Sequence, residues 1–374
     1  LGAPILHYKV CSTFDSSPTI GSIGKATEIG AAVRPGRWIP LVVGAPAIGR
    51  YQVFGNLFAA AGEGVFRLDR HPVMARHPIT PMAEADLGRH LSAQTDLPVS
   101  TISLAAMKSG DSDAVLAQHV ADGAVIIALD VADDDTLRHA GRLIWQGGTT
   151  PVFAVGSQGV EYALVAHWRA QGDLPAERAE PALTPVDQLF AVSGSVAPIT
   201  AEQIAVAEAQ SFHIIPVQAA TAADEASLRA ECERALAAAL SALSDGHDVI
   251  VATARGPHDP AVAAMAAAVD QAGTTMDAAN DRLGAALGRM VADVRTATGL
   301  PRIAIAGGDT SGHALTALGA EALSAVAPIA PGAPLCQIHA RESPQLDGLQ
   351  VTLKGGQMGA PDFFVTTKRG HRDA

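Results

Sequence analysis

The sequence of 374 residues has few cysteines and few aromatic residues. Its three cysteines, Cys11, Cys232 and Cys336, are scattered and form no CxxC pair. This argues against a disulfide framework and against a zinc site, and it favours a reducing cytoplasm. Aromatic residues make up only 4% of the chain, whereas alanine and glycine are abundant. Small residues of this kind favour closely packed layers of helix on sheet.

The sequence also lacks a basic patch and a long apolar run. The net charge is -12, which argues against nucleic acid as a partner. No apolar run reaches the roughly 18 to 20 residues of a membrane span. The N-terminus shows no signal-peptide pattern, and because it begins with Leu1 rather than Met, we expect a further segment upstream.

Apolar runs and alanine-rich stretches alternate along the chain. The runs are rich in Val and Ile and apolar on both faces, as buried parallel strands are; they cover residues 38–47, 123–132, 151–159, 189–197, 213–218, 247–256, 302–312 and 349–356. Their alternation with helical stretches predicts an α/β fold with helices on both faces of the sheet. The length predicts two domains, and the proline-rich segment 170–187 predicts a boundary between domain 1–175 and domain 186–374.

The stretch STFDSSPTIGSIGKA (12–26) resembles a phosphate-binding loop at first sight. A P-loop needs glycine five residues before the Gly-Lys pair and Ser or Thr after it. Thr19 and Ala26 stand at those positions. The stretch is therefore not a P-loop, and we expect its GSIG part to begin a helix capped near Ser22.

Polar residues cluster just before this helix, in KVCSTFD. Lys9, Ser12, Thr13 and Asp15 place a cation, two hydroxyls and a carboxylate within seven residues. This set suits a polyhydroxylated acid, with the lysine on the carboxylate and the others on hydroxyls. The alternative is a polar turn with no ligand.

Two further loops of the N-terminal half carry cations. Arg50 follows a predicted strand in GAPAIGR, where a guanidinium can bind a carboxylate through two parallel hydrogen bonds, or instead pair with an acidic residue. Arg76, His77 and Thr80 lie in the rigid loop RHPVMARHPITPM. No carboxylate follows these histidines at ligand spacing, so we do not predict a metal site there.

Glycine turns follow predicted strands in the C-terminal half. AVSGSVAPITAEQI (191–204) reads as strand, turn and helix, with Thr200 and Gln203 predicted to form a capping box. Residues 193–195 would then meet an anion at the helix start, although an ordinary βα turn is as common.

The sharpest feature is IAIAGGDTSG (303–312), a buried strand that ends in Gly307 and Gly308 before a helix. Backbone amides at a helix start, joined by hydroxyls, can bind phosphate. KGGQMG (354–359) adds another glycine turn with Lys354 before it. These two turns predict a nucleotide across the strand ends, the alternative being purely structural turns.

Taken together, KVCSTFDSSPTIGSIGKA, GAPAIGR, RHPITPM, SGSVAPITAEQI, AGGDTSGHAL and KGGQMG resemble the four-carbon acid sugar kinases, across almost the whole chain and in the same order. The resemblance implies two three-layer α/β domains with mostly parallel sheets and an inter-domain cleft. It also implies an ATP-dependent kinase that phosphorylates the terminal hydroxyl of a threonate, erythronate or 3-oxo-tetronate, and it is compatible with a cytoplasmic homodimer.

The resemblance assigns residues to each ligand. Those implied for the sugar acid are Lys9, Ser12, Thr13, Asp15, Arg50, Arg76, His77 and Thr80. Those implied for the nucleotide are Ser195, Gly307, Gly308, Asp309, Thr310, Gly355 and Gly356. The catalytic residues would be Asp15, which accepts the hydroxyl proton, and Lys354, which stabilises the transferred phosphoryl group, with Asp309 as an indirect Mg²⁺ ligand.

Two departures separate the chain from the family pattern. The family's opening Asp-Asp-x-Thr-Gly-Ala motif does not occur, and its usual Gly-Ser-Cys-Ser is Gly194-Ser195-Val196-Ala197. A non-catalytic sugar-acid or nucleotide-binding protein is therefore the alternative. A dinucleotide-dependent oxidoreductase is disfavoured, because no strand is followed by GxGxxG with a later acidic residue.

Overall fold

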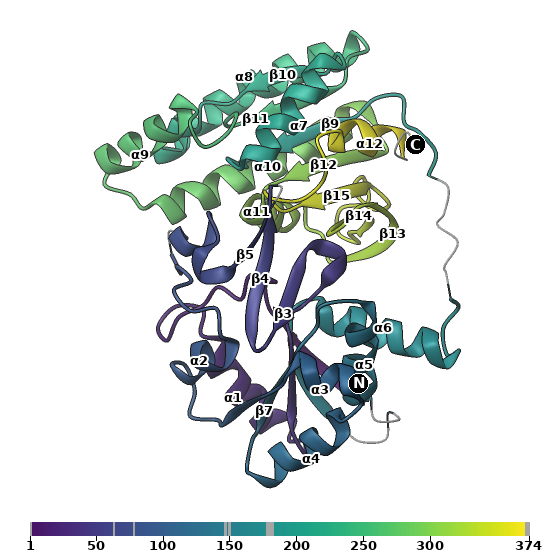
Figure 1. The fold of residues 1–374 in the computed structure, drawn as a ribbon. Helices are drawn as coiled ribbons and strands as arrows, with labels where there is room; N and C mark the ends of the chain where they lie inside the picture. Colours follow the sequence, from purple (N-terminus) through teal and green to yellow (C-terminus); the bar gives the residue numbers. More distant parts are fainter. Residues whose placement is uncertain are drawn as a thin grey trace. The chain divides into compact units, whose positions relative to one another are not determined.

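The computed structural model describes residues 2–62, 64–77, 79–145, 148, 151–176 and 183–370. The chain divides into two compact units, residues 1–178 and 179–374, and Figure 1 shows the ribbon. The predicted boundary segment includes residues 177–182, which lie outside the described residues. Both units have an α/β fold on a mostly parallel sheet, which confirms the predicted fold class.

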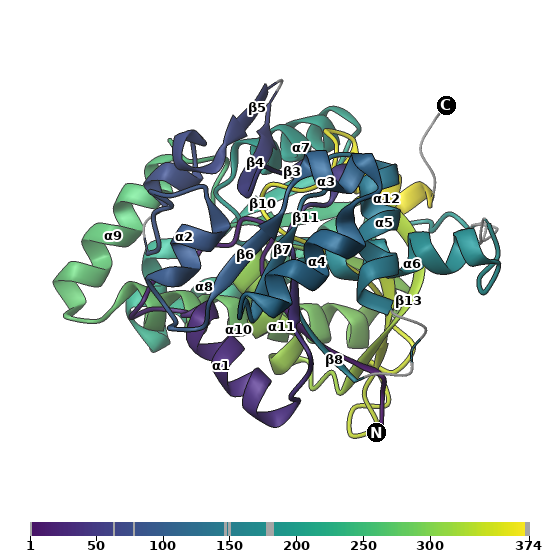
Figure 2. The ribbon, with the colours of Figure 1, turned by 60° about the horizontal axis from the view of Figure 1, so that its bottom comes forward.

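Unit 1 is built on a five-stranded sheet in the order β1-β8-β2-β7-β6. All of its strand pairs are parallel. The strands are β1 (Ile5–Lys9), β2 (Ile39–Val42), β6 (Val99–Ile102), β7 (Ile126–Leu129) and β8 (Val152–Gly156). A separate antiparallel sheet, seen in Figure 2, consists of β3 (Arg50–Val53), β4 (Asn56–Ala61) and β5 (Gly64–Arg67).

Successive residues of β7 belong to two different cores. Ile126 and Ala128 pack in a cluster with residues of α1 and α2, whereas Ile127 and Leu129 pack with residues of α3 to α6. Because side chains alternate across a strand, both faces of the sheet are covered. The helices are α1 (Ile23–Val33), α2 (Leu87–Ser92), α3 (Leu104–Ser109), α4 (Ser112–Ala121), α5 (Asp134–Trp145) and α6 (Gly159–Gln171), with short 3₁₀ helices η1 (Pro46–Ile48), η2 (Leu68–Arg70) and η3 (Met74–Arg76).

Unit 2 is built on a seven-stranded sheet in the order β10-β11-β9-β12-β15-β14-β13. The first five strands are parallel, and β14 and β13 are added antiparallel. The strands are β9 (Phe190–Ser193), β10 (His213–Pro216), β11 (Val249–Ala252), β12 (Arg302–Ala306), β13 (Ala322–Ala330), β14 (Ala333–His339) and β15 (Gln350–Lys354).

The two faces of this sheet are also covered. Ile303 and Ile305 of β12 belong to a core with α8, α10 and α11, and Ala304 and Ala306 belong to a core with α7 and α12. The helices are α7 (Pro198–Ala209), α8 (Glu225–Ser244), α9 (Pro260–Ala272), α10 (Met276–Thr298), α11 (Gly308–Ala317) and α12 (Phe363–Arg369), with the 3₁₀ helix η5 (Ala219–Ala223).

Each of the eight apolar runs contains a strand, as predicted. Ser22 also caps α1 as expected, since its side chain accepts a hydrogen bond from the Lys25 amide. The prediction of a capping box in α7 is wrong. This helix begins at Pro198 after Ala197, with no side-chain cap, so that Thr200 and Gln203 lie inside it and are fully buried.

The ends of three parallel strands in unit 2 are in register. Ala306 of β12 pairs with Ser193 of β9 on one side and with Lys354 of β15 on the other. The residues that follow therefore leave the sheet at one edge, where open α/β sheets bind ligands. We call these segments the β9 turn (194–197), the β12 turn (307–310) and the β15 turn (355–359).

Candidate functional site

The β12 turn begins α11 without a side-chain cap, because its N-cap residue is Gly307. The first helical hydrogen bond runs from the Ser311 amide to the Gly307 carbonyl, at 2.9 Å. The three preceding amides, of residues 308–310, donate to no other described residue. Gly308 is exposed, and a Cβ atom on it would meet no atom within 4 Å. Unpaired amides facing open space suit an anion.

Gly307 itself is required by the backbone. Its φ of +125° is a conformation that other residues rarely adopt, and an added Cβ would lie 2.8 Å from Thr310 Oγ1. An added Cβ on Gly194 would lie 2.2 Å from the same oxygen. Glycine therefore lets the β9 and β12 turns approach each other closely.

The β15 turn contacts the β9 turn in the same way. A Cβ on Gly356 would lie 3.0 Å from Ser195 Oγ. The Ser195 hydroxyl accepts a hydrogen bond from the Ala197 amide at 3.2 Å and lies 3.0 Å from Thr200 Oγ1. The structure thus brings all seven residues predicted for the nucleotide to one edge of the unit 2 sheet.

Lys354 ends β15 beneath this edge and is only 1% exposed. Its ammonium donates to Thr200 Oγ1 at 2.8 Å and to the carbonyls of Gly355 and Gly356, each at 3.3 Å. Burial lowers the pKa of Lys354 to about 8. In this structure the ammonium is directed at protein acceptors, and its direct contact with phosphate stays a prediction.

In unit 1, buried side chains hold the loop after β1 in place. Phe14 is fully buried, with φ of 54°, and its ring lies 5.8 Å from the ring of His90. The Ser16 hydroxyl lies 2.9 Å from His90 Nε2 and accepts a hydrogen bond from Gln94 Nε2 at 3.0 Å. These contacts fix the backbone between the polar side chains predicted to bind the acid.

The polar side chains of this loop that are predicted to bind the acid are less buried than Phe14 and Ser16. The Thr13 hydroxyl donates to Asp15 Oδ1 at 2.5 Å, and both residues are partly exposed. Lys9 is exposed at the end of β1, whereas Ser12 is 9% exposed. Asp15 therefore keeps a second carboxylate oxygen that no described side chain occupies, and that oxygen can face a ligand.

Arg50 begins β3 and is partly buried. Its Nη1 donates to the carbonyls of Ile48 and Gly49, each at 3.2 Å, and its Nε is buried without a hydrogen-bond partner among the described residues. Burial lowers the pKa of Arg50, and proximity to Cys11 opposes this effect. Because no carboxylate pairs with Arg50 in the described part of the chain, its charge is available to an anionic ligand.

The Arg76–Thr80 loop packs onto the same core. Met74 and Met82, on either side of it, share a hydrophobic cluster with Val10 and Phe14. His77 Nδ1 accepts a hydrogen bond from the Thr80 amide at 3.1 Å, Thr80 is buried, and Arg76 is exposed. Pro78 lies outside the described residues. The loop is thus held near the Lys9–Asp15 segment, while no described contact joins their polar side chains.

Asp130, which follows β7 and is fully buried, was not predicted from the sequence. Its carboxylate accepts the amides of Phe54 and Gly55 in the β3–β4 turn and of Leu104 at the start of α3. Phe54 and Gly55 both have positive φ, at 48° and 74°, so the carboxylate stabilises a turn of unfavourable backbone shape. An aspartate directly after a buried strand was the available signal. Asp130 thereby fixes the hairpin that begins at Arg50.

This carboxylate predicts a pH dependence of stability. Burial raises the pKa of Asp130 from 3.8 to about 6, although its backbone hydrogen bonds oppose the shift. The folded state therefore binds this proton more tightly than the unfolded state does. The tighter binding stabilises the fold fully below pH 3.8, and this stabilisation is lost as the pH rises through 6. From pH 7 to pH 5, wild type should gain about 1 kcal/mol in unfolding free energy over Asp130→Asn. Urea unfolding at each pH measures this, and parallel curves would contradict it.

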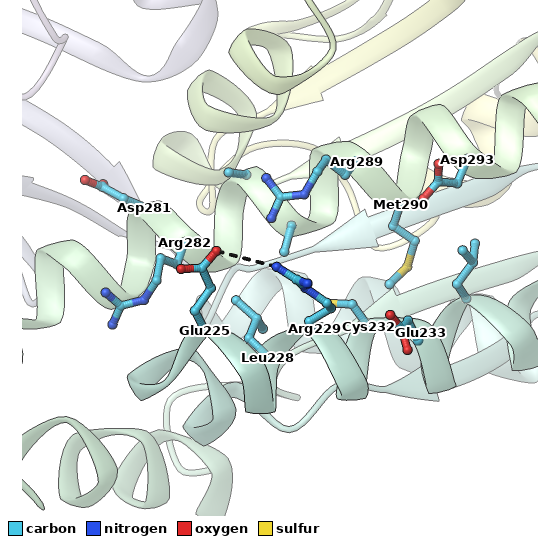
Figure 3. Close-up of a pocket in the computed structure, with 13 residues that line it drawn as sticks. Glu225, Leu228, Arg229, Cys232, Glu233, Asp281, Arg282, Arg289, Met290 and Asp293 are labelled. Atoms are coloured by element: carbon cyan, nitrogen blue, oxygen red, sulfur yellow. Dashed lines mark ion pairs between the residues drawn. The ribbon is translucent and has the colours of Figure 1, made fainter. Parts of the chain in front are cut away.

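Figure 3 shows a groove between α8 and α10 of unit 2, whose lining includes no residue of the β9, β12 or β15 turns. It has a volume of about 590 Å³ and is lined by Arg229, Arg289 and Cys232, among others. None of the residues predicted from the sequence to bind the acid or the nucleotide lines it.

The described residues contain no group of three or more His, Cys, Asp or Glu that could hold a metal. Among them, no helix has the length and apolar character to cross a bilayer.

In comparisons with known proteins, two family models match, one mostly within unit 1 and the other mostly within unit 2. A family model described as a sugar-binding N-terminal domain matches residues 1–164. Another, described as a nucleotide-binding C-terminal domain, matches residues 190–364. A solved protein of Salmonella typhimurium LT2 has the same fold, with a TM-score of 0.76 and 24% identity over 99% of this chain and 82% of its own. Haemophilus influenzae protein HI1011 aligns with a TM-score of 0.67 and 21% identity over 98% and 82%.

Curated relatives are more similar in sequence. The 3-oxo-isoapionate kinase of Paraburkholderia graminis is 46% identical over 370 residues, which cover 99% of this chain and 78% of that protein. The 3-oxo-tetronate kinase of Methylobacterium radiotolerans is 34% identical, over 97% and 80%. The protein is a kinase, and it belongs to the four-carbon acid sugar kinase family.

Proposed function

We propose that this kinase transfers the γ-phosphate of ATP to the terminal hydroxyl of a 3-oxo acid sugar. The observation that carries the proposal is the 46% identity to the 3-oxo-isoapionate kinase over nearly the whole chain. The 34% identical relative is named for 3-oxo-tetronate, so both names share a 3-oxo acid. The three cysteines, which form no disulfide in the structure, support a cytoplasmic location. A homodimer stays a prediction.

The edge of the unit 2 sheet supports the nucleotide half of the proposal. The amides of residues 308–310 and the close contacts among the β9, β12 and β15 turns fit a polyphosphate chain. Ser195, Gly307, Gly308, Asp309, Thr310, Gly355 and Gly356 are the proposed contacts. Fixed peptide dipoles that need no reorientation stabilise negative charge as the phosphoryl group moves.

Asp309 fits the role of a Mg²⁺ ligand. It is exposed at the start of α11 beside the unpaired amides, and Mg²⁺ on a nucleotide needs only one or two carboxylates besides the phosphates. When bound, the ion would neutralise charge on the phosphates. The role of Asp309 is to hold it directly or through water.

The acid half of the proposal rests on unit 1. Arg50 and Lys9 would bind the carboxylate of the acid, while Ser12, Thr13 and the Arg76–Thr80 loop with His77 would contact its oxygens. Asp15 would accept the proton of the attacking hydroxyl through the carboxylate oxygen that Thr13 leaves free. The buried Nε of Arg50, with no described partner, supports an anionic ligand nearby.

A kinase assay tests the proposal. The purified protein is incubated with ATP, Mg²⁺ and either 3-oxo-isoapionate or 3-oxo-tetronate, and ADP release is measured together with the phosphorylated acid. We expect phosphate transfer to at least one of the two acids, and the ratio of their kcat/KM values names the preferred substrate. ADP release without a phosphorylated acid would contradict the proposal. So would the absence of ADP release with both acids.

Arg50→Ala separates the two ligands. Loss of the guanidinium should weaken acid binding by roughly 10- to 100-fold, since a charge-assisted bidentate contact disappears. ATP affinity should change less than about threefold, which calorimetry with each ligand measures. Arg89→Ala is the matched control, because Arg89 lies in the same unit with its side chain 79% exposed. Equal losses for both ligands would refute the division.

A further inference from the structure

The carbonyls of the β15 turn are held from the buried side. Lys354 Nζ donates to the carbonyls of Gly355 and Gly356, and the latter also accepts the Thr200 hydroxyl at 3.0 Å. Further along, Gln203 Nε2 donates to the carbonyls of Met358 and Ala360, each at 3.0 Å. Two residues of α7 and the last residue of β15 therefore fix the peptide planes of this turn.

The orientation of these carbonyls determines where the amides point. In a trans peptide the C=O of one residue and the N–H of the next point in opposite directions. With the carbonyls of Gly355 and Gly356 held inward, the amides of Gly356 and Gln357 point outward. Neither amide donates to another described residue. The turn therefore offers two unpaired donors beside the amides of the β12 turn.

The hydrogen bonds around Thr200 leave no donor of Lys354 free. An ammonium has three donors, and Thr200 Oγ1, the Gly355 carbonyl and the Gly356 carbonyl are three acceptors within 3.3 Å. The Thr200 hydroxyl donates to Gly356 and can accept from Lys354 and from Ser195. The network is satisfied without a phosphate.

We propose that Thr200 and Lys354 are positioning residues, which hold the β15 turn so that its outward amides bind the phosphates of the nucleotide. This inference rests on the proposed function. It differs from the role predicted for Lys354 from the sequence, which was a direct contact with the transferred phosphoryl group. Thr200 was assigned no role toward the nucleotide in that prediction.

The two roles of Lys354 predict different results for single variants. If Lys354 positions the turn, Lys354→Met and Thr200→Val each weaken ADP and ATP binding alike, by roughly 10-fold or more. The double variant then loses little more than the larger single loss, because both side chains act on the same turn. If Lys354 instead contacts the γ-phosphate, Lys354→Met spares ADP binding and lowers kcat, and Thr200→Val binds both nucleotides normally. That second pattern would overturn the inference.

Calorimetry with ADP and with ATP, followed by steady-state kinetics, supplies these readouts. Thr200→Ser keeps the hydroxyl and should restore ADP affinity to within about threefold of wild type. Thr316→Val is the matched control, since Thr316 lies exposed in α11 and its hydroxyl bonds only the Gly312 carbonyl among the described residues. If Lys354→Met fails to fold, the comparison of Thr200→Val with Thr200→Ser still tests the inference. Equal ADP affinity in these two variants refutes it.

The same measurements separate this inference from the proposed function. A wild-type protein that binds no ATP and phosphorylates neither acid contradicts both. A wild-type protein that is active, together with a Thr200→Val variant that binds ADP as tightly, contradicts only the positioning role.

Discussion

Gly308→Val should lower the affinity for ATP by at least about 100-fold while leaving the fold intact. Gly308 is the first residue of α11, exposed, with open space where its side chain would be. A valine there fits the protein, because no atom lies within 4 Å of the added Cβ. It would occupy the space in which we propose that a phosphate oxygen meets the unpaired amides. Calorimetry with ATP measures the loss.

The matched control for this substitution lies one turn along the same helix. Gly312 is also exposed, and a Cβ on it would likewise meet no atom within 4 Å. Gly312→Val carries the same β-branched side chain beyond the unpaired amides, so its ATP affinity should stay within about threefold of wild type. Normal ATP binding by Gly308→Val, with the folded signal in circular dichroism retained, would count against a phosphate at this position.

Arg302→Met should destabilise unit 2 more than any other single change considered above. Arg302 is 2% exposed and donates to Gln350 Oε1 and to the carbonyls of Thr184 and Thr367. No carboxylate pairs with it among the described residues, and burial lowers its pKa. Methionine would leave the buried Thr367 carbonyl unpaired and would remove the part-buried hydrogen bonds to Gln350 and Thr184, at about 1 to 3 kcal/mol for each lost bond. We expect a loss of about 4 kcal/mol in unfolding free energy.

Thermal unfolding measures this effect, which for a unit of this size corresponds to roughly 10 °C in Tm. Arg341→Met is the control, because the Arg341 side chain is 91% exposed and lies 3.6 Å from Glu321. Surface changes of this kind usually alter stability by less than about 0.5 kcal/mol. Similar melting of the Arg302→Met variant and wild type would show that the buried guanidinium does not hold α12 and the segment before β9 to the sheet.

The sequence predicts β2, β7 and β8 of unit 1 and the five parallel strands of unit 2, most of which are buried on both faces. The parallel strands β1 and β6, at the two edges of the unit 1 sheet, were not predicted, because most of their residues are only partly buried. Ile126 to Leu129 and Ile303 to Ala306 are continuous apolar runs, and each run serves two cores. The antiparallel strands β3 to β5 carry no such signal. Few of their residues are buried, and they include Arg50 and Asn56, so tertiary packing rather than hydrophobicity decides their structure.

A local sequence pattern also gave a wrong prediction where the residues make tertiary contacts instead. Thr200 and Gln203 have the spacing of a capping box, yet the helix starts at Pro198. Proline at the first helical position needs no amide partner, and the two polar side chains are then free to reach the β15 turn. Their partners are more than 150 residues away in sequence, so no local rule could find the contact.

The candidate site was predictable in part for the same physical reason. Glycine turns after buried strands mark the carboxyl edge of a sheet, and register then brings the three turns of unit 2 together. The anchoring residues Phe14, Ser16 and Asp130 were not predicted, because their importance lies in contacts with His90, Gln94 and the β3–β4 turn.

The crystal structure of the protein with a non-hydrolysable ATP analogue and Mg²⁺ tests the central claim most directly. We expect the phosphates within hydrogen-bond distance of the amides of residues 308–310 and of the β15 turn, at the edge where β9, β12 and β15 end. An analogue bound instead in the groove between α8 and α10, with the amides of α11 facing water, would contradict it.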